Sequence, residues 1–348
     1  MIEIRLSIQL LGRSPDWQVP PSCQADEARQ IWHGRARAWL TQALECPVPH
    51  STASTEPLER AYAACEALVG SHYENFPVAS RLLPPPMRPH IAAVYAFARV
   101  ADDIADEGVA PAAARQVELG AWQRRLHDIV AGGPPAGLCD DRGALILVAV
   151  SNSIRTLDLP LSLFDDLISA FGQDTMTTRY ASWTDVLDYC RRSANPVGRL
   201  VLRIAGYREA ALDRSSDALC TALQLTNFWQ DFGRDWRAGR LYVPREVQLA
   251  AGAEEAELTH ATITESWGRA LEGCVSLTRE RFREGRAVCD GVRGRLRAEL
   301  RFTWLGGARI LERVEQGRFA LFERRPALGP ADVLLMLWRA VSWRRAQP

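Results

Sequence analysis

The pattern of hydrophobic and polar residues changes near residue 57. From Leu58 onward apolar residues recur at the spacing of amphipathic helices, and the strict alternation of a half-buried strand is absent. Stretches rich in Pro and Gly interrupt this pattern at 82–89, 107–111, 131–137, 158–160, 195–198, 237–244, 251–257 and 327–332. The segments between these breaks predict a single all-α domain over residues 57–348, with roughly ten or more helices.

Residues 1–56 have a different pattern. Two segments rich in Pro, Ser and Thr, at 12–24 and 46–57, flank one short helical pattern at 31–44. Because such a composition buries little apolar surface, we expect a poorly ordered or loosely docked N-terminal extension.

The predicted helix over 88–106 combines an apolar body with a narrow polar line. Tyr95, Arg99, Asp102 and Asp106 are spaced four, three and four residues apart, so they share one face of the helix. The remaining positions are mostly Ile, Val, Phe and Ala. An ordinary surface helix has the reverse proportions, with a broad polar face. The pattern therefore predicts a largely buried helix that carries carboxylates.

A second line of the same kind lies in the predicted helix over 218–235. Gln224, Asn227, Asp231 and Asp235 are spaced three, four and four residues apart among Leu, Phe and Trp. Buried carboxylates must be paired or must coordinate a metal. The two lines are therefore expected to face each other across a cavity, although either motif taken alone also fits a solvated acidic helix face.

The donor atoms of these lines indicate which metal would bind. Carboxylates one helical turn apart suit hard divalent cations, and without His or Cys they suit zinc poorly. Mg²⁺ typically binds one or two carboxylates and completes its shell with water and substrate phosphate. Two opposed Asp pairs, with Asn227 as a neutral oxygen donor, predict a site for several Mg²⁺ ions that bridge to a diphosphate.

Composition narrows the other function classes. Lys plus Arg equals Asp plus Glu at 42 each, so no overall field attracts nucleic acid, and no nucleic-acid partner is expected. The cysteines are dispersed, without metal-ligand spacing, as expected of thiols in a reducing compartment. The pattern shows no export signal, and the longest apolar run, 144–150, is far shorter than the ~20 residues of a membrane span. We expect a cytoplasmic protein, and the apolar C-terminal segment near Trp338 is compatible with peripheral contact at the inner face of the membrane.

Four segments resemble the squalene and phytoene synthase family. They are YAFARVADDIADE (95–107), RYASWTDVLDYCRRSANPVG (179–198), LQLTNFWQDFGRD (223–235) and GRLYVP (239–244), and the resemblance covers roughly residues 58–325. It implies an all-α isoprenoid synthase fold, in which one helical domain surrounds a central apolar cavity with bound Mg²⁺ at its mouth.

The resemblance also implies roles for single residues. Metal ligands for two or three Mg²⁺ ions are implied at Asp102, Asp106, Asn227, Asp231 and Asp235. Substrate-binding residues near the diphosphate are implied at Tyr95, Arg99, Gln224 and Gln230. Tyr189 is implied to line the reaction cavity as a catalytic residue, together with Arg99.

The segment SHYENFPVASRLLP (71–84) departs from many relatives, which have a serine pair where this chain has His72 to Asn75. We place His72, Tyr73 and Asn75 in the substrate site and also assign Tyr73 a catalytic role. Asn195 and Pro196 replace smaller residues common in the family. Both changes suit a single larger substrate, and both segments are most similar to the hopanoid-pathway branch of the family, the bacterial hydroxysqualene synthases.

For that branch the resemblance implies presqualene diphosphate as the substrate, with water rather than hydride capturing the rearranged cation. No nicotinamide is then expected, and contact with other hopanoid-pathway enzymes is compatible with the assignment. Head-to-head condensation of two prenyl diphosphates, giving presqualene diphosphate, squalene or phytoene, is the alternative reaction. A non-catalytic, lipid-binding relative is the third hypothesis, and the complete aspartate quartet disfavours it.

Overall fold

The computed structural model describes residues 56–71, 83–106, 110–132 and 141–343, and these residues form helices without any β-strand. The first half contains α2 (Glu56–Ser71), a 3-10 turn (Pro85–Met87), α4 (Arg88–Asp106), α5 (Ala112–Gly132), α6 (Arg142–Leu157), α7 (Leu161–Asp174), α8 (Trp183–Ser193) and α9 (Asn195–Ile204). The second half contains α10 (Ala210–Gln230), α11 (Phe232–Arg237), α12 (Arg245–Ala251), a 3-10 turn (Glu255–His260), α13 (Glu265–Gly291), α14 (Gly294–Gln316), a 3-10 turn (Arg318–Ala320) and α15 (Pro330–Val341). The predicted all-α fold is confirmed.

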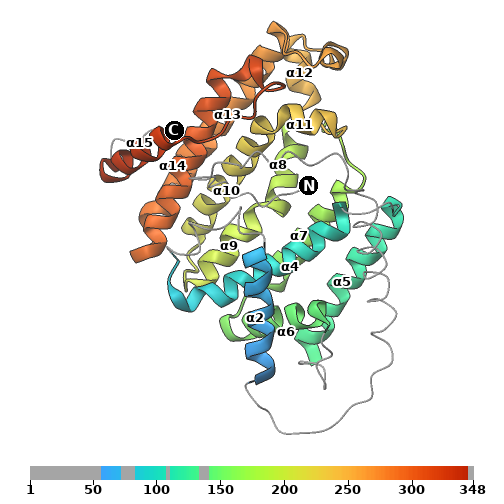
Figure 1. Cartoon of the computed structure of the whole chain (residues 1–348), viewed down its shortest axis with the longest axis vertical. Helices are drawn as coiled ribbons and strands as arrows, with labels where there is room; N and C mark the ends of the chain where they lie inside the picture. Colours follow the sequence, from blue (N-terminus) through green and yellow to red (C-terminus); the bar gives the residue numbers. More distant parts are fainter. Residues whose placement is uncertain (1–55, 72–82, 107–109, 133–140, 344–348) are drawn as a thin grey trace, which may run out of the picture.

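Two long helices organise the packing. α4 packs against α2, α5, α6 and α7, whereas α10 packs against α8, α9, α13 and α14. Figure 1 shows α2 and α6 at one end of the molecule and α11 and α12 at the other, with α4, α7 and α8 between them. One continuous core of buried apolar side chains runs through both groups. α4 and α10 thus each have helices packed against them on several sides.

Glycines let three neighbours approach α10 closely. A Cβ atom at Gly285 of α13 would lie 2.6 Å from the backbone N of Leu219, and one at Gly198 of α9 would lie 2.4 Å from Ser216 Oγ. A Cβ atom at Gly307 of α14 would lie 2.4 Å from a methyl carbon of Leu223. A methyl group at any of these three glycines would collide with α10. The absence of such groups lets α9, α13 and α14 pack closely against α10, which is therefore buried on several sides.

Gly285→Ala is expected to destabilise the protein. The nearest atoms are the backbone N and Cα of Leu219, at 2.6 and 2.7 Å, and a helix backbone moves less readily than a side chain. Overpacking should lower the free energy of unfolding by about 1–3 kcal/mol, against a gain of up to about 1 kcal/mol in helix propensity. Gly172→Ala in α7 is the control, because no atom lies within 4 Å of its added Cβ. Urea unfolding of both variants tests this, and equal stability would contradict the close approach.

Most predicted breaks coincide with helix ends. α4 ends at Asp106, α12 ends at Ala251 before the left-handed Gly252, and α15 begins at Pro330. The break predicted at 195–198 is wrong in detail, because α9 begins at Asn195 directly after Ala194. Pro196 lies in the first turn of α9, where its missing N–H has no helical partner to lose. The chain therefore bends between α8 and α9 without a loop.

Several predictions concern other parts of the chain. The proposed extension at 1–56 lies outside the described residues except for Glu56, where α2 begins. The cysteines among the described residues carry free thiols.

Within the described ranges, no helix combines the length and apolar character needed to cross a membrane. On α15, Leu334, Leu337 and Trp338 are exposed, and their contact with a membrane stays a prediction.

Candidate functional site

The first aspartate line lies on α4 as predicted. Tyr95 and Asp102 are buried, whereas Arg99 and Asp106 are partly exposed. Arg99 forms ion pairs with Asp102 at 3.4 Å and with Asp103 at 2.6 Å. The helix therefore sets a guanidinium group beside two carboxylates, as a binding site for a polyanion and its cations requires.

The ionised form of Asp102 is energetically unfavourable without a bound cation. Burial, with the nearby negative charge of Asp106 as a second cause, raises the pKa of Asp102 to about 7. A carboxyl group that resists ionisation beside another carboxylate is stabilised in its charged form by an added cation. The α4 line thus has the electrostatic character of a cation site.

The second line differs from the prediction, because it spans two helices rather than one. α10 ends at Gln230, and Asp231 has φ −95° and ψ 10°, outside the helical region. Gly233 follows at the start of α11, where a Cβ atom would lie 2.6 Å from the backbone oxygen of Leu321. The helical spacing of the line continues from α10 into α11, because the amide of Asp235 donates to the carbonyl of Asp231 at 2.8 Å. The line therefore keeps its spacing across the break.

Arg325 binds the carboxylate of Asp231. Its Nε donates to Oδ1, and its Nη2 donates to Oδ2 at 3.1 Å. The segment after α14 that carries Arg325 is held in part by the side chain of Gln230, whose amide donates to the carbonyl of Pro326 at 2.6 Å. The ionised form of Asp235 is also unfavourable, since burial and then the charge of Asp231 raise the pKa of Asp235 to about 7.

Arg240 lies between the two lines. Its Nη2 donates to Asp106 Oδ1 at 2.9 Å, and its charge also acts on Asp235. The GRLYVP segment that carries it is fixed by backbone hydrogen bonds, in which the amides of Leu241 and Arg245 donate to the carbonyls of Thr178 and Tyr180 at 3.0 and 2.9 Å. Within the described residues, the guanidinium group of Arg240 thus bonds to a carboxylate of α4 and acts on a carboxylate of α11.

Aromatic rings pack beside this guanidinium group. Tyr189 is fully buried, and its ring centroid lies 5.8 Å from that of Tyr180, 6.1 Å from that of Phe228 and 6.3 Å from that of Tyr242. Phe228 and Tyr242 are stacked with centroids 3.7 Å apart. The negative faces of such rings attract cations, which makes the cluster a suitable wall for a carbocation.

The donor set fits Mg²⁺ in its chemistry. The side chains of the two lines offer oxygen donors of the kind that Mg²⁺ prefers, at Asp102, Asp106, Asn227, Asp231 and Asp235. The ionised forms of two of these carboxylates are unfavourable without a cation. Among the described residues, no three His, Cys, Asp or Glu side chains are grouped closely enough to hold one ion. Mg²⁺ does not need three such side chains, because it typically binds one or two carboxylates and completes its shell with water and substrate phosphate. Gln224 is buried on α10 in the same line.

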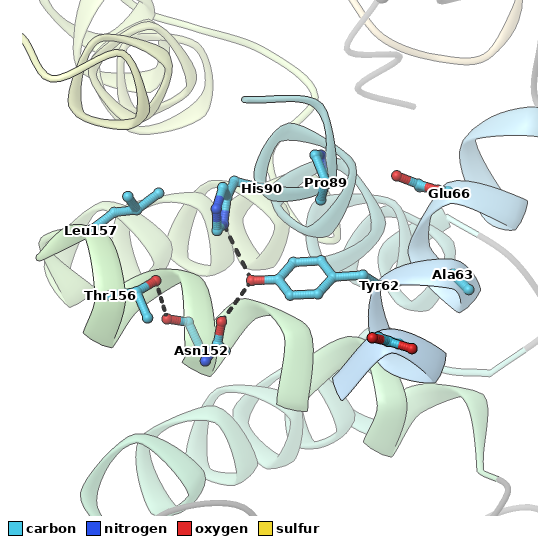
Figure 2. A pocket seen from close by; sticks show the side chains of 9 residues that line it. Tyr62, Ala63, Glu66, Pro89, His90, Asn152, Thr156 and Leu157 are labelled. Carbon is cyan, nitrogen blue, oxygen red and sulfur yellow. Dashed lines mark hydrogen bonds between the residues drawn. The ribbon is translucent and has the colours of Figure 1, made fainter. Parts of the chain in front are cut away.

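A surface hollow between α2, α4 and α6 is a separate feature. Tyr62 and His90 line it, and the Tyr62 hydroxyl contacts His90 Nδ1 at 3.2 Å and Asn152 Oδ1 at 2.9 Å (Figure 2). His90 lies about 24 Å from Asp106 along the axis of α4. Because its polar groups bond to one another and it lies at the opposite end of α4 from Asp102 and Asp106, we do not place the reaction there.

Sequence reasoning missed three members of the site. Arg240, Arg325 and Asp174 are close to the predicted residues only through tertiary packing, and none belongs to a periodic line. The only available signal was the position of Arg240 within GRLYVP, which follows the second line directly. His72, Tyr73 and Asn75 lie outside the described residues, so their assigned roles stay predictions.

Comparisons with known proteins identify the family of the chain. Residues 69–332 match the squalene/phytoene synthase family. The hydroxysqualene synthase of Zymomonas mobilis is 39% identical over 193 residues, which cover 54% of this chain but less than two thirds, 61%, of that protein. The hydroxysqualene synthase of Rhodopseudomonas palustris is 33% identical over 271 residues, covering 77% of this chain and 88% of that protein. Phytoene synthases are also similar, at 26–33% identity.

A solved structure extends the comparison to three dimensions. The squalene synthase of Alicyclobacillus acidocaldarius matches with a TM-score of 0.69 at 37% identity, over 76% of this chain and 96% of that one. The fold and the two aspartate lines define an α-helical isoprenoid synthase. The chain belongs to the squalene/phytoene synthase family.

Proposed function

We propose that the protein ionises presqualene diphosphate in the presence of Mg²⁺ and captures the rearranged cation with water, giving hydroxysqualene. The observation that carries this proposal is that Arg240, which bonds to Asp106 and acts on the carboxylate of Asp235, lies in the same segment as Tyr242 of the aromatic cluster. Similarity to hydroxysqualene synthases supports the particular reaction.

Binding of the diphosphate is the first task of the site. Arg99, Arg240 and Arg325 each already contact a carboxylate of the two lines, so their guanidinium groups lie where diphosphate oxygens would arrive. Guanidinium groups bind such oxygens in a bidentate manner. When bound, Mg²⁺ would neutralise the roughly three negative charges of the departing diphosphate.

Protection of the cation is the second task. Tyr189, Phe228 and Tyr242 pack against one another, and each is largely buried from solvent. Ring faces stabilise positive charge, and burial keeps bulk water away until one positioned water can react. The C30 product would therefore depend on which nucleophile this cluster admits.

Head-to-head condensation is the alternative reaction, and the similarity to phytoene synthases supports it. Within the described residues, the single-substrate interpretation rests on Asn195 and Pro196, which lie buried at the start of α9. Asn195 Oδ1 accepts a hydrogen bond of 3.0 Å from Thr221 of α10, three residues before Gln224. A fixed Asn–Pro pair at this place leaves less room beside α10 than two smaller residues would.

A product assay tests the proposal. Purified protein with presqualene diphosphate and Mg²⁺, but without nicotinamide, should give a C30 alcohol that carries the label when the solvent is ¹⁸O-water. Added NADPH should leave the product unchanged, because water is the nucleophile. Efficient conversion of farnesyl diphosphate alone, or squalene formation that depends on NADPH, would replace this proposal with the condensing reaction. Chelation by EDTA should stop pyrophosphate release, and Mg²⁺ should restore it.

A further inference from the structure

Asp174 is a buried carboxyl group outside both aspartate lines. It is the last residue of α7, is only 7% exposed, and accepts a hydrogen bond of 2.9 Å at Oδ2 from the hydroxyl of Tyr189. Tyr189 comes from α8, which packs against α7 (Figure 1). The pair therefore joins two helices at the edge of the aromatic cluster.

This is an unfavourable place for a carboxylate. The C-terminus of a helix carries partial negative charge, and burial withdraws the group from water. Burial accordingly raises the pKa of Asp174 to about 7. If the side chain only anchored Tyr189, a neutral amide oxygen would accept the same hydrogen bond at a lower electrostatic cost. A carboxyl group in this place is therefore better explained by proton transfer than by anchoring.

The pair lies beside the proposed reaction site. Asp174 is within electrostatic reach of Arg240 and Asp106, and it also acts on Tyr180 and Tyr242. Arg240 in turn bonds directly to Asp106. The Tyr189–Asp174 pair thus lies within electrostatic reach of the Asp106 end of the first line, next to which we place the carbocation.

We propose that Tyr189 and Asp174 form the proton relay for the water that captures the carbocation. The inference rests on the proposed function, because a captured water must lose a proton to become an alcohol. Asp174 acts through Tyr189, so it both positions the hydroxyl and accepts its proton.

The transfer balances without any further reactant. The water oxygen supplies the electron pair of the new C–O bond, and one water proton moves to Tyr189 Oη. At the same time the phenol proton moves to Asp174 Oδ2, which leaves a neutral alcohol and a protonated carboxyl group. Because burial raises the pKa of Tyr189 well above its ordinary value, the two transfers are concerted and no free phenolate forms. Asp174 returns its proton to solvent or to the released diphosphate when the product leaves.

Product partitioning of Asp174→Asn tests the relay. The amide keeps the volume and the acceptor for Tyr189 but cannot accept a proton, so water capture should slow while ionisation continues. With presqualene diphosphate and Mg²⁺, we expect pyrophosphate release within about fivefold of the wild type, and at least a tenfold fall in the ratio of C30 alcohol to C30 hydrocarbons. Tyr189→Phe should shift the ratio in the same direction. Asp165→Asn is the control, since that α7 carboxylate pairs with Gln123 and His127 instead.

The outcomes separate this inference from the proposed function. A wild-type protein that forms no alcohol refutes the proposed function itself. If the wild type forms the alcohol and both Asp174→Asn and Tyr189→Phe keep the wild-type ratio, the relay is wrong and the proposed function stands. Loss of pyrophosphate release in folded Asp174→Asn would also overturn the relay, because it would place Asp174 in the ionisation step. If Asp174→Asn does not fold, the Tyr189→Phe ratio alone decides.

Discussion

Asp102→Ala and Asp231→Ala should each lower pyrophosphate release by at least about 10³-fold, equivalent to about 4 kcal/mol of transition-state stabilisation. Each change removes one oxygen donor from a line of the proposed Mg²⁺ site. The fold should persist in both variants, because each change removes a carboxylate and leaves the apolar core side chains unchanged. In the metal-free protein, loss of Asp102 also relieves its repulsion with Asp106, so thermal stability should not fall. Circular dichroism and a coupled pyrophosphate assay measure the two effects.

Asp217→Ala is the matched control for these variants. Asp217 is an aspartate of α10 that pairs with Arg199, about 21 Å along the helix axis from Asp231 at the end of that helix. We expect its release rate to stay near that of the wild type. Near-normal release from Asp102→Ala or Asp231→Ala would show that the corresponding line does not bind the catalytic metal.

The sequence predicted those features that depend on local periodicity. Tyr95, Arg99, Asp102 and Asp106 share one face of α4 because their spacing fixes their direction on any helix. The burial of Tyr95 and Asp102 was predictable as well, since apolar residues surround the line. The same logic located the second line, but it missed the joint at Asp231, because the contact of Gly233 with the segment near Leu321 is not local in sequence.

The remaining parts of the site arise from contacts between distant segments. Arg240 meets Asp106 across 134 residues, and Arg325 meets Asp231 across 94. Asp174 looks like an ordinary polar residue at a helix end until α8 places the Tyr189 hydroxyl against it. Periodicity cannot reveal such pairs, because a charged residue in a loop has no register that indicates its partner. The sequence therefore pointed to the carboxylates and to Arg99, but not to Arg240 and Arg325, whose guanidinium groups pair with Asp106 and Asp231.

Arg240→Leu should separate stability from catalysis. The Arg240 and Asp106 side chains are 19% and 14% exposed, so removing the cation leaves a largely buried carboxylate without this partner. Breaking such a pair costs about 3 kcal/mol, and the metal-free variant should unfold several degrees below the wild type. Mg²⁺ should raise the Tm of the variant more than that of the wild type, because the ion no longer competes with Arg240 for Asp106. Pyrophosphate release should still fall about 10²-fold, since a diphosphate contact is lost.

Arg245→Leu is the control for this experiment, because Arg245 directly follows the segment at the start of α12 but pairs with Glu254 and Gln248. It is 42% exposed, so its ion pair should contribute little. Thermal unfolding with and without Mg²⁺, followed by the release assay at saturating substrate, gives both readouts. A loss of stability that Mg²⁺ does not recover would mean that Asp106 does not receive the ion. Wild-type release from Arg240→Leu would show instead that Arg240 neutralises Asp106 without contacting the diphosphate.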